Sequence, residues 1–245
     1  MIRQKMIEQK IGVKPDTVMR GGDVSRLEGL TDAVFGFAIT LLVVSLDVPD
    51  NFDELQRELL HFPAFVACFA LLLVFWRAHY DYFRRFGLED GFVITVNSAL
   101  LFVILFFVYP LKFLFSWTID GLLGLPTDVM RPDGVATPAI EPQDIPLLMT
   151  FYGTGMVLIA VCFVLLYLHA LRLGGVLNLT TRERIEAEGD LAECVAYIGI
   201  ATLSIVLAWV FQSGTLSGLT YLLYPVAGGF FGRRTEARVR RASKT

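Results

Sequence analysis

Six long apolar segments constrain the fold of this 245-residue chain more than any other feature of its sequence. A helix that crosses the hydrocarbon core of a bilayer, about 30 Å thick, needs roughly 20 mostly apolar residues. Only Gln212, Ser213 and Gly214 separate the last two segments, which predicts a tight helical hairpin. The expected transmembrane helices are residues 30–48, 62–80, 92–115, 147–171, 191–211 and 215–231.

The composition supports this interpretation and argues against soluble classes. Charged residues make up 18% of the chain and hydrophobic residues 55%, whereas a typical soluble domain is about 25% charged. The apolar runs lack the alternation that the strands of a membrane β-barrel require. We therefore expect an all-α membrane protein with six transmembrane helices per subunit. Residues 30–232 would form the transmembrane domain, between an N-terminal extension (residues 1–29) and a basic tail (residues 233–245).

Lysine and arginine are distributed unequally between the two sides of the membrane. With six spans, eighteen of the 21 basic residues fall on the side that holds both termini, and only Arg57, Lys112 and Arg131 fall on the other. Because cytoplasmic segments carry the excess of basic residues, we expect both termini to be cytoplasmic. The basic tail directly follows a helix end, so its expected partner is anionic membrane lipid and no nucleic acid.

Motifs for enzyme chemistry are missing from the sequence. It contains no H-E-x-x-H zinc motif, no G-x-S-x-G nucleophile elbow and no P-loop. His61, His79 and His169 lie on different segments without the spacing of metal ligands. We therefore predict no catalytic residues, no cofactor and no metal beyond permeating cations in transit.

Polar residues occur at the inner ends of the first three predicted helices. Thr31 and Asp32 open the first, where they could simply favour a helix N-terminus. The second helix runs inward and the third runs outward, so each brings polar residues to the same depth. We expect these side chains to form a structural polar cluster that orients the first helix, with a role in gating as an alternative. The cluster comprises Arg26, Thr31, Asp32, Trp76, His79 and Asn97.

One face of the first helix is a candidate pore lining. With Thr40 as the reference direction, Gly36 and Val44 lie about 40° to either side and Asp47 within about 20°. Small residues on a stripe allow close helix approach in lipid, and packing within one subunit is the simpler explanation. In the alternative, several copies surround an axis. Thr40 then supplies a ring of hydroxyls, apolar neighbours a dry constriction, and Asp47 an acidic outer mouth.

The segment around this helix resembles the transmembrane protein 175 family, the endolysosomal-type potassium channels and their prokaryotic relatives. Arg26 and Asp32 match the family pattern of Arg, three residues, then Phe-Ser-Asp, with Leu30 and Thr31 replacing Phe and Ser. Residues 75–79 resemble the Trp-x-x-His ending of the second helix of the family. The resemblance covers roughly residues 26–115 with specific residues.

This resemblance implies a potassium-permeable cation channel that conducts sodium more weakly. It implies one six-helix repeat, as in prokaryotic members, and a homotetramer in the cell membrane with first helices around the pore. The carbonyl-lined filter sequence Thr-Val-Gly-Tyr-Gly is missing from the chain. In the family, isoleucine or leucine on the first helix makes the constriction, and Phe37 occupies the matching position here. The pore-lining residues implied are Phe37, Thr40, Leu41 and Val44.

Two alternatives to a channel stay open from the sequence. One is a proton- or ion-coupled small transporter that uses Asp32 and His79 as a protonation pair, since histidine titrates near neutrality. The other is a membrane scaffold without transport. Unitary currents would distinguish a channel from both.

Overall fold

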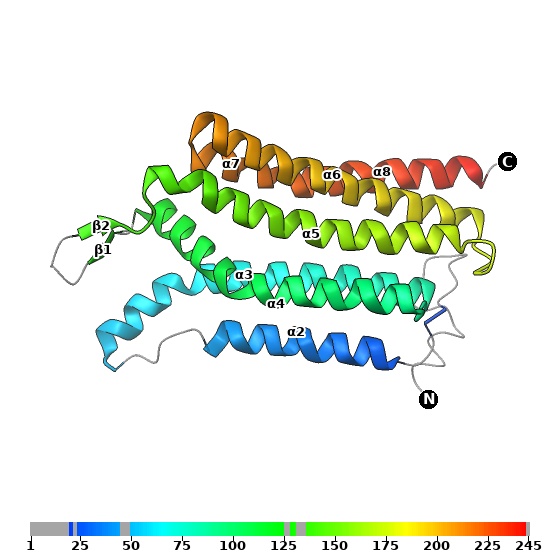
Figure 1. Ribbon diagram of the computed structural model, residues 1–245, viewed down its shortest axis with the longest axis horizontal. Coiled ribbons are helices and arrows are strands. Elements are labelled where there is room, and N and C mark those ends of the chain that lie inside the picture. Colours follow the sequence, from blue (N-terminus) through cyan, green and yellow to red (C-terminus); the bar gives the residue numbers. More distant parts are fainter. Residues whose placement is uncertain (1–19, 22–23, 45–49, 125–127, 131–135, 244–245) are drawn as a thin grey trace.

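The computed structural model describes residues 20–21, 24–44, 50–124, 128–130 and 136–243, which are mostly helical (Figure 1). The long helices are α2 (Arg26–Val44), α3 (Phe52–Phe86), α4 (Gly91–Leu123), α5 (Ile145–Arg172) and α6 (Thr181–Phe211). A short helix α7 (Gly214–Leu219), a 3-10 turn η2 (Thr220–Leu222) and α8 (Leu223–Ala242) follow. Between α4 and α5 lie the antiparallel strands β1 (Asp128–Met130) and β2 (Ala136–Pro138), and the 3-10 turn η1 (Pro142–Asp144).

Five helices in the described residues are long and apolar enough to cross a membrane, and they coincide with the first five expected segments. Each helix begins before the expected residue, and in α2 and α6 a capping box fixes the earlier start. Ser25 and Glu28 cap α2 reciprocally through side chain and backbone. Thr180 and Glu183 do the same for α6. The apolar spans are Arg26–Val44, Phe62–Phe86, Gly91–Val108, Pro142–Arg172 and Thr181–Phe211.

The sixth expected segment, residues 215–231, is not one continuous α-helix. It is divided among α7, η2 and the start of α8. Pro225 lies in the first turn of α8, where the missing proline N–H removes one bond to the preceding turn. The α8 helix then continues to Ala242, so most of the basic segment expected as a tail extends this helix.

The helices lie side by side and alternate in direction, with α2 at one edge of the molecule and α8 at the other (Figure 1). The α8 helix returns along α6, and α2 begins at the same end of the molecule where α8 finishes. The apolar core runs through α3, α4 and α5 and includes Tyr82, Leu100 and Leu166. The α2 helix packs against this core through Phe35, Ala38 and Leu42.

Candidate functional site

A chain of hydrogen bonds connects α2, α3 and α4 near the end where α2 begins. The Asn97 Nδ2 donates to the Thr31 Oγ1 at 3.0 Å, and the Asn97 Oδ1 lies 2.9 Å from the His79 Nε2. The Thr31 hydroxyl donates in turn to the Leu27 carbonyl at 2.9 Å. Thr31, His79 and Asn97 are all buried. In the hydrocarbon region such polar groups need partners inside the protein, so this chain holds three helices in one arrangement.

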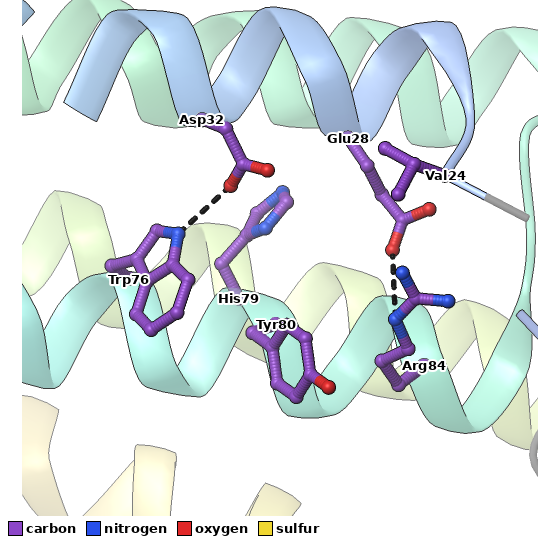
Figure 2. A pocket seen from close by; sticks show the side chains of 7 residues that line it. All are labelled: Val24, Glu28, Asp32, Trp76, His79, Tyr80 and Arg84. Atoms are coloured by element: carbon purple, nitrogen blue, oxygen red, sulfur yellow. Dashed lines mark hydrogen bonds and ion pairs between the residues drawn. The ribbon is translucent and has the colours of Figure 1, made fainter. Parts of the chain in front are cut away.

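A direct hydrogen bond between α2 and α3 lies beside this chain of hydrogen bonds (Figure 2). The Trp76 Nε1 donates to the Asp32 Oδ1 at 2.8 Å. The structure thus brings together five of the six residues expected in the polar cluster. The sixth, Arg26, is exposed at the start of α2, and within the described residues its side chain makes no hydrogen bond or ion pair. Six residues rotate a helix by about 240°, so Arg26 and Asp32 face different directions.

An ion pair that the sequence does not reveal connects α2 to α3 nearby. The Arg84 Nε lies 3.5 Å from the Glu28 Oε1, and both side chains are buried (Figure 2). The spacing of Ser25 and Glu28 is a recognisable capping box, but nothing local in the sequence identifies Arg84 as the partner. A pocket of about 230 Å³ lies beside this pair. Its lining residues are Val24, Glu28, Asp32, Trp76, His79, Tyr80 and Arg84.

Asp32 and His79, the pair considered for proton coupling, both line this pocket. Each is bound to another group, Asp32 to the Trp76 indole and His79 to the Asn97 amide. Among the described residues there is no hydrogen bond between the two. The described residues also contain no group of three or more His, Cys, Asp or Glu side chains placed to hold a metal ion.

The opposite face of α2 has no packing partner among the described residues. Phe37 is 57% exposed, Leu41 41% and Val44 71%. Thr40 is exposed as well, and its hydroxyl donates to the Gly36 carbonyl one turn back at 2.9 Å. At Gly36 the space that a Cβ would occupy is open. Asp47, expected at an outer mouth, lies outside the described residues.

This exposed face lies on the opposite side of α2 from the face that packs against the core. The buried residues Thr31, Phe35, Ala38 and Leu42 centre about 180° from Thr40 at 100° per residue. All four pore-lining candidates therefore lie on the face that the described part of the chain leaves uncovered. A hydroxyl bonded back to its own helix still directs its oxygen lone pairs outward, so Thr40 can accept contacts from water or a cation.

Asp90, between the α3 and α4 spans, caps the end of α4 on the polar-cluster side. Its carboxylate accepts hydrogen bonds from the backbone N–H groups of Phe92 and Val93, and the other oxygen lies 2.8 Å from the His169 Nε2. Burial alone would raise the pKa of Asp90, but the hydrogen bonds from His169 and from the two backbone N–H groups lower it below its usual value. The charged form of this carboxylate therefore joins α4 to the end of α5.

Comparison with known proteins assigns the family. Residues 26–107 match the family model "Endosomal/lysosomal potassium channel TMEM175". A protein of Marivirga tractuosa described as "Potassium channel" is 34% identical over 247 residues, which cover 97% of this chain and 98% of that protein.

Two solved structures share the architecture. A crystal structure of a variant of the potassium channel MtTMEM175 matches with a TM-score of 0.78 and 33% identity, covering 93% of this chain and 100% of that one. A lysosomal potassium-selective channel TMEM175 homologue from Chamaesiphon minutus matches in fold, with a TM-score of 0.54 and 22% identity. It covers 86% of this chain and 96% of that chain.

The matched family consists of ion channels and not of enzymes. The described residues of this chain contain five helices long and apolar enough to cross a membrane, and the fold matches that of a channel of this family, so the chain is a multi-pass membrane protein. The match to the Marivirga tractuosa protein extends over nearly the full length of both chains. The chain therefore belongs to the family of the endosomal/lysosomal potassium channel TMEM175.

Proposed function

We propose that this protein is a potassium-permeable cation channel whose pore is lined by the α2 helices of four identical subunits. The observation that carries the proposal is the uncovered face of α2, which combines Thr40 with exposed apolar side chains on a membrane-spanning helix. Small residues and a hydroxyl on such a face favour contact with other helices and with water over contact with lipid tails. The relatives described as potassium channels support the assignment.

In this channel, Phe37, Leu41 and Val44 form an apolar constriction and the Thr40 hydroxyls form a polar ring. An apolar constriction gates by expelling water, so a small rotation of α2 switches conduction. A cation that enters sheds part of its hydration shell, and the Thr40 oxygens replace some of that water. Potassium holds its water less tightly than sodium, which makes sodium the weaker permeant. Asp47 at the outer mouth attracts cations, and cations in transit are the only metal that function requires.

We also propose that six crossings place both termini in the cytoplasm of a prokaryotic cell, with the protein in the cell membrane. Residues 30–232 then form the transmembrane domain, after a cytoplasmic extension (residues 1–29). The shared end of α2 and α8 in Figure 1 supports an even number of crossings. Arg233 to Arg241 on α8 gather at this same end, where they contact anionic lipid headgroups.

Single-channel recording of the purified protein in a planar bilayer tests the proposal. We expect unitary currents and a reversal potential that favours potassium over sodium, while a carrier or a scaffold gives no unitary events. Chemical cross-linking in nanodiscs should yield a tetramer. Currents without potassium preference would contradict the proposed selectivity. A stable monomer would contradict the proposed pore between four subunits.

Thr40→Ala provides the residue-level test, with Thr202→Ala as its matched control. Thr202 is also an exposed threonine of a membrane-spanning helix, bonded back to the Ile198 carbonyl at 2.8 Å. Thr40→Ala should lower the ratio of potassium to sodium permeability several-fold, because the oxygens that replace lost water are gone. Thr202→Ala should leave the ratio unchanged. Equal potassium-to-sodium permeability ratios in the two variants would contradict the proposed ring of Thr40 hydroxyls.

A further inference from the structure

The short segment that precedes α2 is bound to the far side of the bundle. The two Nη atoms of Arg20 donate to the two carboxylate oxygens of Glu183 on α6, each at 2.9 Å. The Arg20 Nε donates to the Leu177 carbonyl at 3.0 Å. The Glu183 side chain is 0% exposed and that of Arg20 is 15% exposed. A buried bidentate pair of this kind fixes both the orientation and the separation of the two side chains, unlike an ion pair on the surface.

Gly21 is held on α3 directly beside this pair. Its N–H donates to the Arg84 carbonyl at 3.2 Å, and its own carbonyl accepts from the Arg84 Nη1 at 2.8 Å. A Cβ on Gly21 would lie 2.8 Å from the Phe83 carbonyl oxygen, which leaves room only for glycine. Gly87 closes the contact from the other side. It has φ +60°, and a Cβ there would lie 3.0 Å from the carbonyl carbon of Arg20.

The last turn of α3 links this segment to both α2 and α6. Arg84 binds Gly21 and also forms the ion pair with Glu28 in the first turn of α2. The next residue, Arg85, pairs with Glu186 and Asp190 on α6. The N-terminal segment, the first turn of α2 and the start of α6 therefore meet at one junction.

We propose that the Arg20–Glu183 pair is a tether that positions the inner end of α2 and sets the gating equilibrium of the pore. This inference rests on the proposed role of α2 as the pore lining. Arg26 follows Gly21 by five positions, a reach of at most about 18 Å when fully extended. Within the described residues, α2 is held by the packing of its buried face on α3 and α4 and by the polar contacts near its inner end. The tether adds a connection to α6 at that same end. Arg20 acts as a positioning residue, since it does not contact the proposed pore.

The test compares Arg20→Gln, Glu183→Gln and the double variant with wild type in nanodiscs and bilayers. Glutamine at position 183 preserves the capping box of α6, because glutamine also serves at that position. Arg184→Gln is the matched control, since Arg184 is next to Glu183 on α6, pairs with Glu188 one turn further along, and has 67% of its side chain exposed. Each variant is measured by amide hydrogen exchange in the first two turns of α2 and by single-channel recording.

We expect exchange in these turns to speed up about tenfold in Arg20→Gln and to stay at the wild-type rate in Arg184→Gln. The ratio of open to closed time should change about tenfold, with unitary conductance and the potassium-to-sodium ratio unchanged. In the double variant, exchange should be no faster and the open-to-closed ratio no further from wild type than in Arg20→Gln, because the double variant leaves no unmatched buried charge. A purely structural role would lower protein yield without changing the open-to-closed ratio.

The outcomes separate the tether from the proposed channel. Wild-type exchange rates in folded Arg20→Gln overturn the tether, whatever the currents are. Faster exchange with an unchanged open-to-closed ratio overturns its role in gating. A wild-type protein that passes no current, while Arg20→Gln still speeds exchange, overturns the proposed function and leaves only a structural tether.

Discussion

The two edges of the bundle are held together by different means. At the α8 edge, helices approach closely through glycines. A Cβ on Gly153 of α5 would meet the Ile205 side chain of α6 at 2.6 Å, and one on Gly189 of α6 would meet Thr235 of α8. At the α2 edge, Gly29 and Gly36 face open space, and polar side chains near one end make specific contacts. Close packing against neighbours on both sides fixes α6, whereas α2 packs through one face only and its polar contacts lie near one end. We therefore expect α2 to rotate more easily than α6.

Asn97→Leu gives the largest expected effect on this comparison, because it removes the polar chain at the α2 edge. The buried His79 loses its partner and Thr31 loses a donor. We expect the free energy of unfolding to fall by about 2–3 kcal/mol, since each unmatched buried partner costs about 1–3 kcal/mol. Unfolding in a denaturing-detergent titration measures it. Ser98→Ala, at an exposed neighbour bonded only to its own helix, is the control, and equal losses in both variants would refute the polar chain.

Gly189→Ala examines the opposite edge and should have a smaller effect. The added methyl meets Thr235 on α8, so one of the two helices must shift. Gly199, also on α6, has open space where a Cβ would lie and provides the matched control. Gly199→Ala should raise the free energy of unfolding by up to about 1 kcal/mol through helix propensity, whereas Gly189→Ala should lower it by about 1 kcal/mol. Identical shifts in the same titration would contradict close packing at this edge.

Asp90→Asn gives the smallest expected effect and adds a pH dependence. The pKa of Asp90 is lowered in the folded protein, so its charged form stabilises the fold above the unfolded-state pKa of about 3.9. That contribution is lost as pH falls through the lower folded-state pKa. Since 41% of the Asp90 side chain is exposed, the loss in Asp90→Asn at pH 7 should be under about 1 kcal/mol. Unfolding temperatures should differ between variant and wild type at pH 7 and converge as the pH falls through the lowered folded-state pKa of Asp90. If the difference in unfolding temperature persists in acid, the charge of Asp90 is not its cause.

The sequence predicts the membrane helices well because long apolar runs are a local property. It also places Thr31, His79 and Asn97 at one depth, since depth follows from position along each span. It predicts the sixth helix less well, because the interruption at η2 depends on how Ser217 and Thr220 bond to neighbouring backbone and side chains. The start of α2 was predictable from the capping box of Ser25 and Glu28.

Contacts between distant segments could not be predicted from these patterns. Arg20 and Glu183 are 163 residues apart, and neither lies in a pattern that indicates the other. Likewise, the pairing of Glu28 with Arg84 depends on how α2 and α3 pack. Such pairings are decided by tertiary geometry, for which a single sequence contains no periodic signal.

The early start of α6 has a consequence for the whole assembly. About ten residues of this helix, roughly 15 Å at 1.5 Å per residue, precede the stretch apolar enough to require lipid. Glu183, Glu186 and Asp190 lie on that projecting length, and Glu188 there is joined to α8 by Arg238. In the proposed topology this length of α6 projects from the membrane into the cytoplasm. A binding protein raised against it would therefore test the proposed tether without entering the bilayer.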